Sequence, residues 1–225
     1  MNPQIRNFAR KALWTLPLWT ALLFLGTLTH QPDPQTAFPA FAAYITTDVF
    51  LLSHLVASIA GAAIGSIGVV GLLLYLQETK GAGKSITATV VTVVSNIFLT
   101  SVFGVAAFAQ PAMGRMFLAG EQSAVDFYNQ VYTAPLMATA MLALLLFLIG
   151  GAFMGSAIAA SGLLPRWTGW AYALGMVGYV VSFIILPVGM SVFSALLIIT
   201  TIAIARSATR EPRPQVAEIA IAPGA

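Results

Sequence analysis

The stretch WTGWAYALGMVGYVVSFIILPVGMSVFSALLIITTIAIA, from Trp167 to Ala205, decides the fold because it is apolar throughout. As a single helix it would be roughly 58 Å long at about 1.5 Å per residue. The hydrocarbon core of a bilayer is only about 30 Å thick. The stretch must therefore fold back, and the turn sequence within it is Leu186-Pro187-Val188-Gly189, since Pro ends a helix and Gly permits a reversal. The sequence predicts a helical hairpin with spans over about 167–186 and 188–205.

The rest of the chain has the same character. It has 225 residues, of which 59% are hydrophobic and 8% charged, against about 25% charged in a typical soluble domain. So few charges cannot cover a water-soluble protein of this size. Four more apolar segments are long enough to cross a bilayer, at about 12–29, 49–76, 86–109 and 132–160. The predicted fold is an all-α integral membrane protein, a bundle of six transmembrane helices.

The basic residues orient this bundle. With six spans, nine of the ten Lys and Arg residues fall on one side of the membrane. These nine are Arg6, Arg10, Lys11, Lys80, Lys84, Arg166, Arg206, Arg210 and Arg213. Only Arg115 lies opposite, together with four acidic residues, Asp33, Asp48, Glu121 and Asp126. By the positive-inside rule both termini are cytoplasmic, and we expect the plasma (inner) membrane of a bacterium as the location.

Three regions make up the predicted chain organisation. Residues 1–11 form a cytoplasmic N-terminal segment, 12–206 the transmembrane domain, and 207–225 a cytoplasmic tail whose prolines predict disorder. On the outer side, 38–48 is apolar enough for a short helix at the membrane interface, and 111–131 is an amphipathic loop.

The second span carries a stripe of small residues below a histidine. His54, Ser58, Gly61, Gly65 and Gly68 lie within roughly 40° of one line at about 100° per residue. Small residues let helices approach closely in lipid, so helix packing is the favoured interpretation. The alternative is a groove for a flat cofactor or a lipid.

The third span carries a polar stripe centred on Asn96, which includes Thr92 and Thr100. An amide without a partner is costly in lipid. We therefore expect these intramembrane polar side chains to bond to a neighbouring helix, with a ligand contact as the alternative. Because a short loop joins the two spans, our hypothesis is that their stripes face each other.

His54 is the ionisable residue placed well inside a span, and such residues are functional candidates. It could bind haem or a pigment, with His30, Met137 or Met141 at comparable depth as a second ligand. A neutral histidine hydrogen-bonded to a neighbouring helix is the more ordinary interpretation. We therefore expect no cofactor and keep haem or pigment at His54 as an alternative.

Two other motifs have structural interpretations. Gly151 and Gly155 repeat the small-xxx-small spacing and predict a further helix contact. The loop Glu78–Ser85 ends in Gly-Lys-Ser like a phosphate-binding loop, but Glu78 occupies the position of the required first Gly and no strand precedes it. We expect no nucleotide and, at a net charge of +3, no nucleic acid; the bilayer is the expected partner, with other membrane subunits as candidates.

The sequence contains no Cys and no recognisable catalytic or metal-binding motif, so we expect neither enzyme activity nor a metal. The segment Leu163-Leu164-Pro165-Arg166-Trp167-Thr168-Gly169-Trp170 and the Leu73-Leu74-Tyr75-Leu76 end of the second span resemble small bacterial multi-pass membrane proteins of a domain-of-unknown-function type. That resemblance implies a six-helix bacterial membrane protein and no activity.

The leading interpretation is therefore a non-enzymatic accessory, assembly or structural membrane protein. A small transporter or permease is the alternative, suggested by Pro17 in the first span and Asn96 in the third. A haem- or pigment-binding protein that uses His54 is the third possibility.

Overall fold

The computed structural model describes residues 2–29, 31–186 and 188–210. It is 84% helical, and the described residues form no strand, as the sequence predicts. The helices in chain order are α1 (Pro3–Ala12), α2 (Thr15–Gly26), α3 (Phe38–Ile45), α4 (Asp48–Leu52), the π-helix η1 (Ser53–Ala60), α5 (Gly61–Leu76), α6 (Ala82–Leu118), α7 (Ser123–Val131), α8 (Ala134–Ala160), α9 (Arg166–Ile185) and α10 (Val188–Thr209).

Five helical segments within the described ranges are long and apolar enough to cross a membrane. These segments are Asp48–Leu76, Ala82–Leu118, Ala134–Ala160, Arg166–Ile185 and Val188–Thr209. The last two confirm the predicted hairpin, although Pro187 itself lies outside the described residues. Helix α10 also continues past Ala205 to Thr209, so the predicted tail begins later than expected, and 211–225 lie outside the described residues.

The predicted first span, 12–29, is not one helix. Helix α2 covers residues 15–26 of it, and Leu13 and Trp14 separate α2 from α1, which ends at Ala12. The cause is Pro17, which has no N–H to donate to the carbonyl of Leu13 and so interrupts the helical hydrogen bonds at this point.

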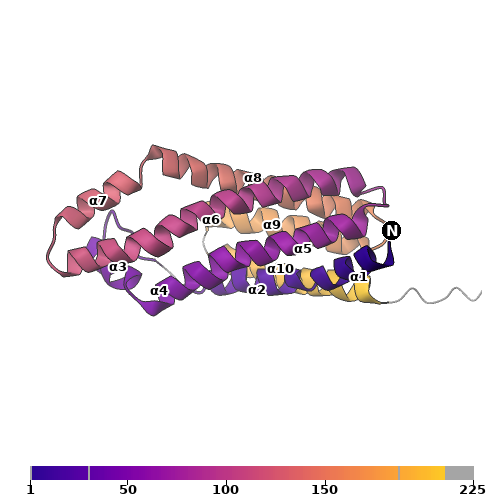
Figure 1. Cartoon of the computed structure of the whole chain (residues 1–225), viewed down its shortest axis with the longest axis horizontal. Coiled ribbons are helices and arrows are strands. Elements are labelled where there is room, and N and C mark those ends of the chain that lie inside the picture. Colours follow the sequence, from indigo (N-terminus) through magenta and orange to yellow (C-terminus); the bar gives the residue numbers. More distant parts are fainter. Residues whose placement is uncertain (1, 30, 187, 211–225) are drawn as a thin grey trace, which may run out of the picture.

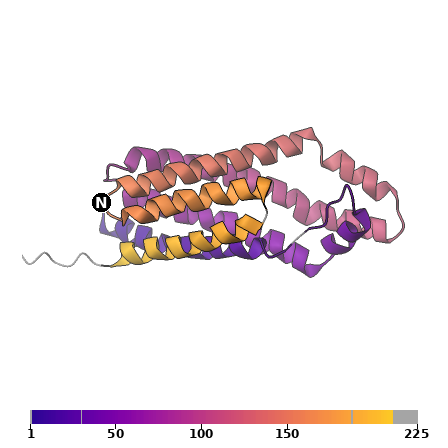
Figure 2. The same ribbon diagram turned by 180° about the vertical axis from the view of Figure 1, so that it is seen from behind.

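The long helices form a closed ring. Contacts link α6 to α8, α8 to α9, α9 to α10, α10 to α2, α2 to α5 and α5 back to α6. Figures 1 and 2 show these helices running side by side along the long axis of the molecule. The start of α1, the end of α10 and the α5–α6 and α8–α9 turns lie at one end (Figure 1). The basic residues predicted to be cytoplasmic lie at this end as far as the structure describes them, and Arg213 lies outside the described residues.

A helical cap covers the opposite end. Helix α6 has 37 residues, about 56 Å at 1.5 Å per residue, and it runs beyond the ends of α9 and α10 (Figure 2). The helix continues beyond the predicted end of this span near residue 109, through Pro111 to Leu118. Packing against α3 holds this extension, where the backbone of Ala42 approaches Gly114 closely. The predicted loop at 111–131 is therefore helical over most of its length, with α7 completing it, and α3 supplies the expected short helix.

Aromatic side chains fill the interior of this cap. Phe38, Phe41 and Tyr128 meet edge-to-face or tilted, with ring centroids 5.4 to 5.9 Å apart. Met113 on α6 is fully buried in the same cluster. The cap thus has its own small apolar core, distinct from that of the ring.

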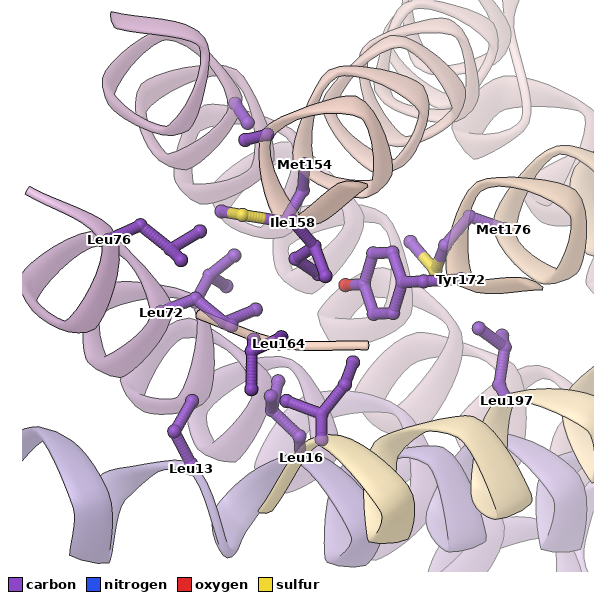
Figure 3. Packing of buried hydrophobic residues seen from close by; sticks show 14 of the residues in the cluster. Leu13, Leu16, Leu72, Leu76, Met154, Ile158, Leu164, Tyr172, Met176 and Leu197 are labelled. Atoms are coloured by element: carbon purple, nitrogen blue, oxygen red, sulfur yellow. The ribbon is translucent and has the colours of Figure 1, made fainter. Parts of the chain in front are cut away.

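The other half of the ring, near the N-terminus, is solid core. Figure 3 shows Tyr172 of α9 surrounded by apolar side chains from α2, α5, α8 and α10. Leu16, Leu72, Ile158 and Leu197 among them are fully buried. This packing makes the N-terminal half of the bundle a continuous apolar interior.

Glycines let α2 lie directly against α5. A Cβ atom placed on Gly65 would lie 2.7 Å from the indole of Trp19, and one on Gly68 would lie 2.5 Å from Leu16. Trp19 is only 1% exposed, so its ring has little room to move away. Gly151 and Gly155 have the same function on α8, where they lie against Met176 and Ala173 of α9.

Gly65→Ala should therefore destabilise the protein. The added methyl group would overlap the indole of Trp19, and overpacking of this kind costs about 1–3 kcal/mol. The measurement is reversible unfolding of the purified protein in mixed micelles. The matched control is Gly104→Ala on α6, where a Cβ would meet no atom within 4 Å and where Ala should stabilise the helix by up to about 1 kcal/mol. Equal stability of the two variants would show that Trp19 does not rest on Gly65.

Candidate functional site

The half of the ring nearer the cap contains a partly open cavity of about 690 Å³. This volume lies in the range of about 300–1,000 Å³ that is usual for small-molecule sites. Its walls come from α2, η1, α6, α8, α9 and α10, and from Gln31 and Tyr44 toward the cap. Most of the lining side chains are apolar, and five are aromatic residues of the bundle: Trp19, Phe103, Phe147, Tyr179 and Phe183.

Trp19 and Phe147 form the floor of this cavity. Their ring centroids are 5.9 Å apart and the rings meet edge-to-face at 75°. Both residues also belong to the buried core of the ring. The cavity therefore ends where the solid core begins.

The π-helix η1 forms one wall. Its i→i+5 hydrogen bonding widens each turn, so the rotation of 100° per residue used for the sequence stripe does not apply there. His54 and Ser58 line the cavity, whereas Gly61, Gly65 and Gly68 face α2. The single stripe predicted for this span is thus two surfaces, and the prediction that it faces the polar stripe of α6 is wrong.

The polar stripe of α6 divides between two neighbouring helices. The hydroxyl of Thr89 donates to the carbonyl of Val69 on α5 at 3.4 Å, and that of Ser95 donates to the carbonyl of Ala143 on α8 at 2.8 Å. Thr92 lies against Gly150 of α8, while Thr100 donates locally to the carbonyl of Asn96 at 2.6 Å. These residues join α5, α6 and α8 through hydrogen bonds and close contacts.

Asn96 lines the cavity and is 4% exposed. Its Nδ2 donates to the carbonyl of Ala62 at 3.2 Å and to Oγ of Ser66 at 3.0 Å, both on α5. These bonds fix the amide orientation and leave Oδ1 buried without a hydrogen-bond partner. A buried acceptor left unpaired is unfavourable by about 1–3 kcal/mol, so Asn96 Oδ1 is the polar atom of this cavity that most needs a partner.

His54 occupies the wall between two phenylalanines. Its ring centroid lies 4.2 Å from that of Phe50 and 6.1 Å from that of Phe103. Nδ1 lies 3.0 Å from the carbonyl of Phe50 and 3.3 Å from the hydroxyl of Ser53. An Nδ1–H group that donates to the carbonyl of Phe50 suits the neutral ring expected for a structural histidine.

The residues considered as second ligands of a haem or pigment are not found beside His54 among the described residues that line the cavity. Met137 and Met141 on α8 are 52% and 53% exposed, and neither is among the residues that line the cavity. His30 lies outside the described residues. Within the described part of the chain no three His, Cys, Asp or Glu residues are grouped to hold a metal ion.

Hydroxyl pairs join α2 to α10 along the next wall. In the core, Oγ1 of Thr20 lies 3.0 Å from Oγ1 of Thr201. Beside the cavity, Oγ1 of Thr27 lies 2.8 Å from Oγ of Ser191. Side-chain bonds of this type between helices in membranes contribute about 0.6 kcal/mol on average. Helix α2 is thus held by glycine contacts on one side and by hydroxyl groups on the other.

At the opposite end of the molecule, the loop Glu78–Ser85, which contains Lys80 and Lys84, connects α5 to α6 tightly. The backbone of Ala157 on α8 lies close to Gly81, and Lys84 Nζ donates to Oγ of Ser156 at 2.8 Å. Helix α6 begins at Ala82 within this loop. The loop residues Gly81 and Lys84 therefore contact α8.

No protein-family model, curated protein or solved structure matches this chain.

Some features of the site have no signal in the sequence. Nothing in Ser53–Ala60 distinguishes a π-helix from an α-helix, and the cavity depends on how six segments pack. The unpaired Oδ1 also follows from the positions of Ala62 and Ser66 on the neighbouring helix. The signals that sequence did provide were His54 and Asn96 as polar residues within apolar segments, and both line the cavity.

Asn96 and Ser66 should be energetically coupled. In a double-mutant cycle of Asn96→Ala and Ser66→Ala, we expect a coupling of about 0.6 kcal/mol and at most about 1.7 kcal/mol, measured by unfolding in mixed micelles. Ser101→Ala serves as the control partner, because Ser101 bonds to the carbonyl of Phe98 on its own helix. Coupling to Ser101 that equals coupling to Ser66 would contradict the bond across the helices.

Proposed function

We propose that the protein is a non-enzymatic accessory protein of the bacterial inner membrane that holds an apolar molecule within its bundle. The observation that carries this proposal is the cavity of about 690 Å³ beside the solid core. Concave sites with mostly apolar walls and few polar groups are typical of small-molecule binding. The resemblance of the Leu163–Trp170 turn to bacterial multi-pass proteins supports the location.

The proposed topology has six crossings, with both termini in the cytoplasm. Helices α1 and α2 together form the first crossing, because they follow one another along α5 and complete the ring. Apolar side chains such as Leu18, Leu25 and Ile97 are more than half exposed, as expected for a surface that contacts lipid. The basic residues at the N-terminal end supply the orientation.

Cysteine labelling tests this orientation, since the native chain has no Cys. In intact cells, a membrane-impermeant maleimide should label Glu121→Cys and should label Lys80→Cys only after permeabilisation. Both positions are exposed, so accessibility to the reagent does not bias the comparison. The opposite pattern would reverse the orientation, and labelling of both from outside would rule out the crossing by α6.

The binding function itself is tested with farnesyl methyl ether, a flexible apolar molecule without a donor. Bound ligand raises the unfolding midpoint of the folded state, so the ether should raise the midpoint of the protein in lipid nanodiscs. Ala140→Phe places a ring in the cavity and should abolish the increase. Ala138 lies on the exposed side of the same helix, so the Ala138→Phe variant should retain the increase in the unfolding midpoint. Equal responses of the two variants would show that the ether acts on the bilayer and not in the cavity.

A small transporter is the second candidate function, and η1 favours it. A π-helical segment inside a long helix often marks a functional site, and this one forms a wall of the cavity. Transport requires that the cavity open to each side in turn. Uptake of the ether by proteoliposomes, with none by Ala140→Phe, would favour a transporter over an accessory protein.

A further inference from the structure

We propose that the ligand of this cavity is a neutral apolar alcohol whose hydroxyl group donates a hydrogen bond to Oδ1 of Asn96. This inference rests on the proposed binding function and names the chemical class of the ligand. It depends on three properties of the cavity: the charge of its lining, the position of its unpaired acceptor, and its shape.

The lining selects a neutral molecule. None of the described residues around the cavity is an Asp, Glu, Lys or Arg. A charged group placed there would lose its hydration without gaining an opposite charge, which is strongly unfavourable. His54 is the ionisable exception, and the adjacent carbonyl of Phe50 accepts from its Nδ1.

The acceptor selects a donor on the ligand. Because Nδ2 of Asn96 is held by the carbonyl of Ala62 and the hydroxyl of Ser66 on α5, the amide cannot rotate without the loss of both bonds. Oδ1, the remaining polar atom of this side chain, is an acceptor and is itself buried, so a ligand hydroxyl would reach it by a small displacement of the side chains that cover it. A hydroxyl group can satisfy this oxygen, whereas an ether or a ketone cannot, since neither has a hydrogen to donate.

The shape selects an elongated ligand with the hydroxyl at its inner end. The cavity is lined from Trp19 to Gly26 on α2 and from Asn96 to Phe103 on α6, each about 11 Å at 1.5 Å per residue. Among the residues of α6 that line the cavity, Asn96 is the one nearest the solid core. The hydroxyl group of an apolar alcohol would thus reach Asn96 while its hydrocarbon chain fills the aromatic part toward the cap.

Two sources share this chemistry: a free isoprenoid alcohol, and a diacylglycerol of the bilayer with its single hydroxyl. Farnesol and dioleoylglycerol represent them as separate arms of one experiment. The arm with the larger stabilisation identifies the source. If neither compound stabilises the protein, the proposal is wrong.

The decisive comparison is farnesol against farnesyl methyl ether, in the unmodified protein in nanodiscs. The two molecules differ by one methyl group on the oxygen, which removes the donor. We expect farnesol to bind about tenfold more tightly, because it pairs an acceptor that otherwise stays unsatisfied. Ala140→Phe, whose ring occupies part of the cavity, corrects for any difference in how the two compounds act on the lipid.

The outcomes separate the two proposals. If neither compound stabilises the protein beyond the effect seen in Ala140→Phe, the binding function fails. If both bind equally, the cavity binds apolar molecules but the hydrogen bond to Asn96 is wrong.

Variants then assign the hydroxyl to its partner. Asn96→Leu, similar in size but without an acceptor, should remove the preference for farnesol. Ser191→Ala, which deletes a hydroxyl from another wall of the cavity, should retain it. If Asn96→Leu does not fold, Ser191→Ala and His54→Phe remain informative, because loss of the preference in either would place the bond elsewhere.

Discussion

The contact between Trp19 and Gly65 holds the architecture together. Pro17 interrupts the N-terminal segment, so α2 is too short to cross a membrane alone, and it must be held by its neighbours. The absence of a Cβ at Gly65 lets the indole lie on the backbone of α5. This contact closes the ring of helices and also sets the floor of the cavity, because the same indole meets Phe147.

The interior consequently has two different halves. Below Trp19 the ring is filled by leucine, isoleucine, methionine and tyrosine side chains. Above it, the wider turns of η1 and the divergence toward the cap leave space. Thr20 in the core pairs with Thr201 of a neighbouring helix, whereas Asn96 at the boundary keeps one oxygen unpaired.

The sequence predicted the helical class and the α9–α10 hairpin. Both follow from the length of the apolar segments compared with the thickness of a bilayer, and that length can be read directly from the sequence. The sequence did not show the break between α1 and α2 or the length of α6, since the effect of a proline depends on its neighbours. Pro17, in the first turn of α2, interrupts the hydrogen bonds that would join α1 to α2, whereas α3 supports α6 through Pro111. His54 and Asn96 were identifiable as polar residues within apolar segments. Their common cavity was not, because a π-helix changes which residues share a face and no local pattern encodes it.

The solid half of the interior has an electrical consequence. In an energised membrane the potential falls mainly across the dry, low-dielectric part of a protein, and it amounts to about 2.3 kcal/mol per elementary charge for each 100 mV. Leu16, Leu72, Ile158 and Tyr172 fill that part with buried side chains. In a bundle that spans such a membrane, this dry half would carry a large part of the potential difference and would oppose the passage of ions.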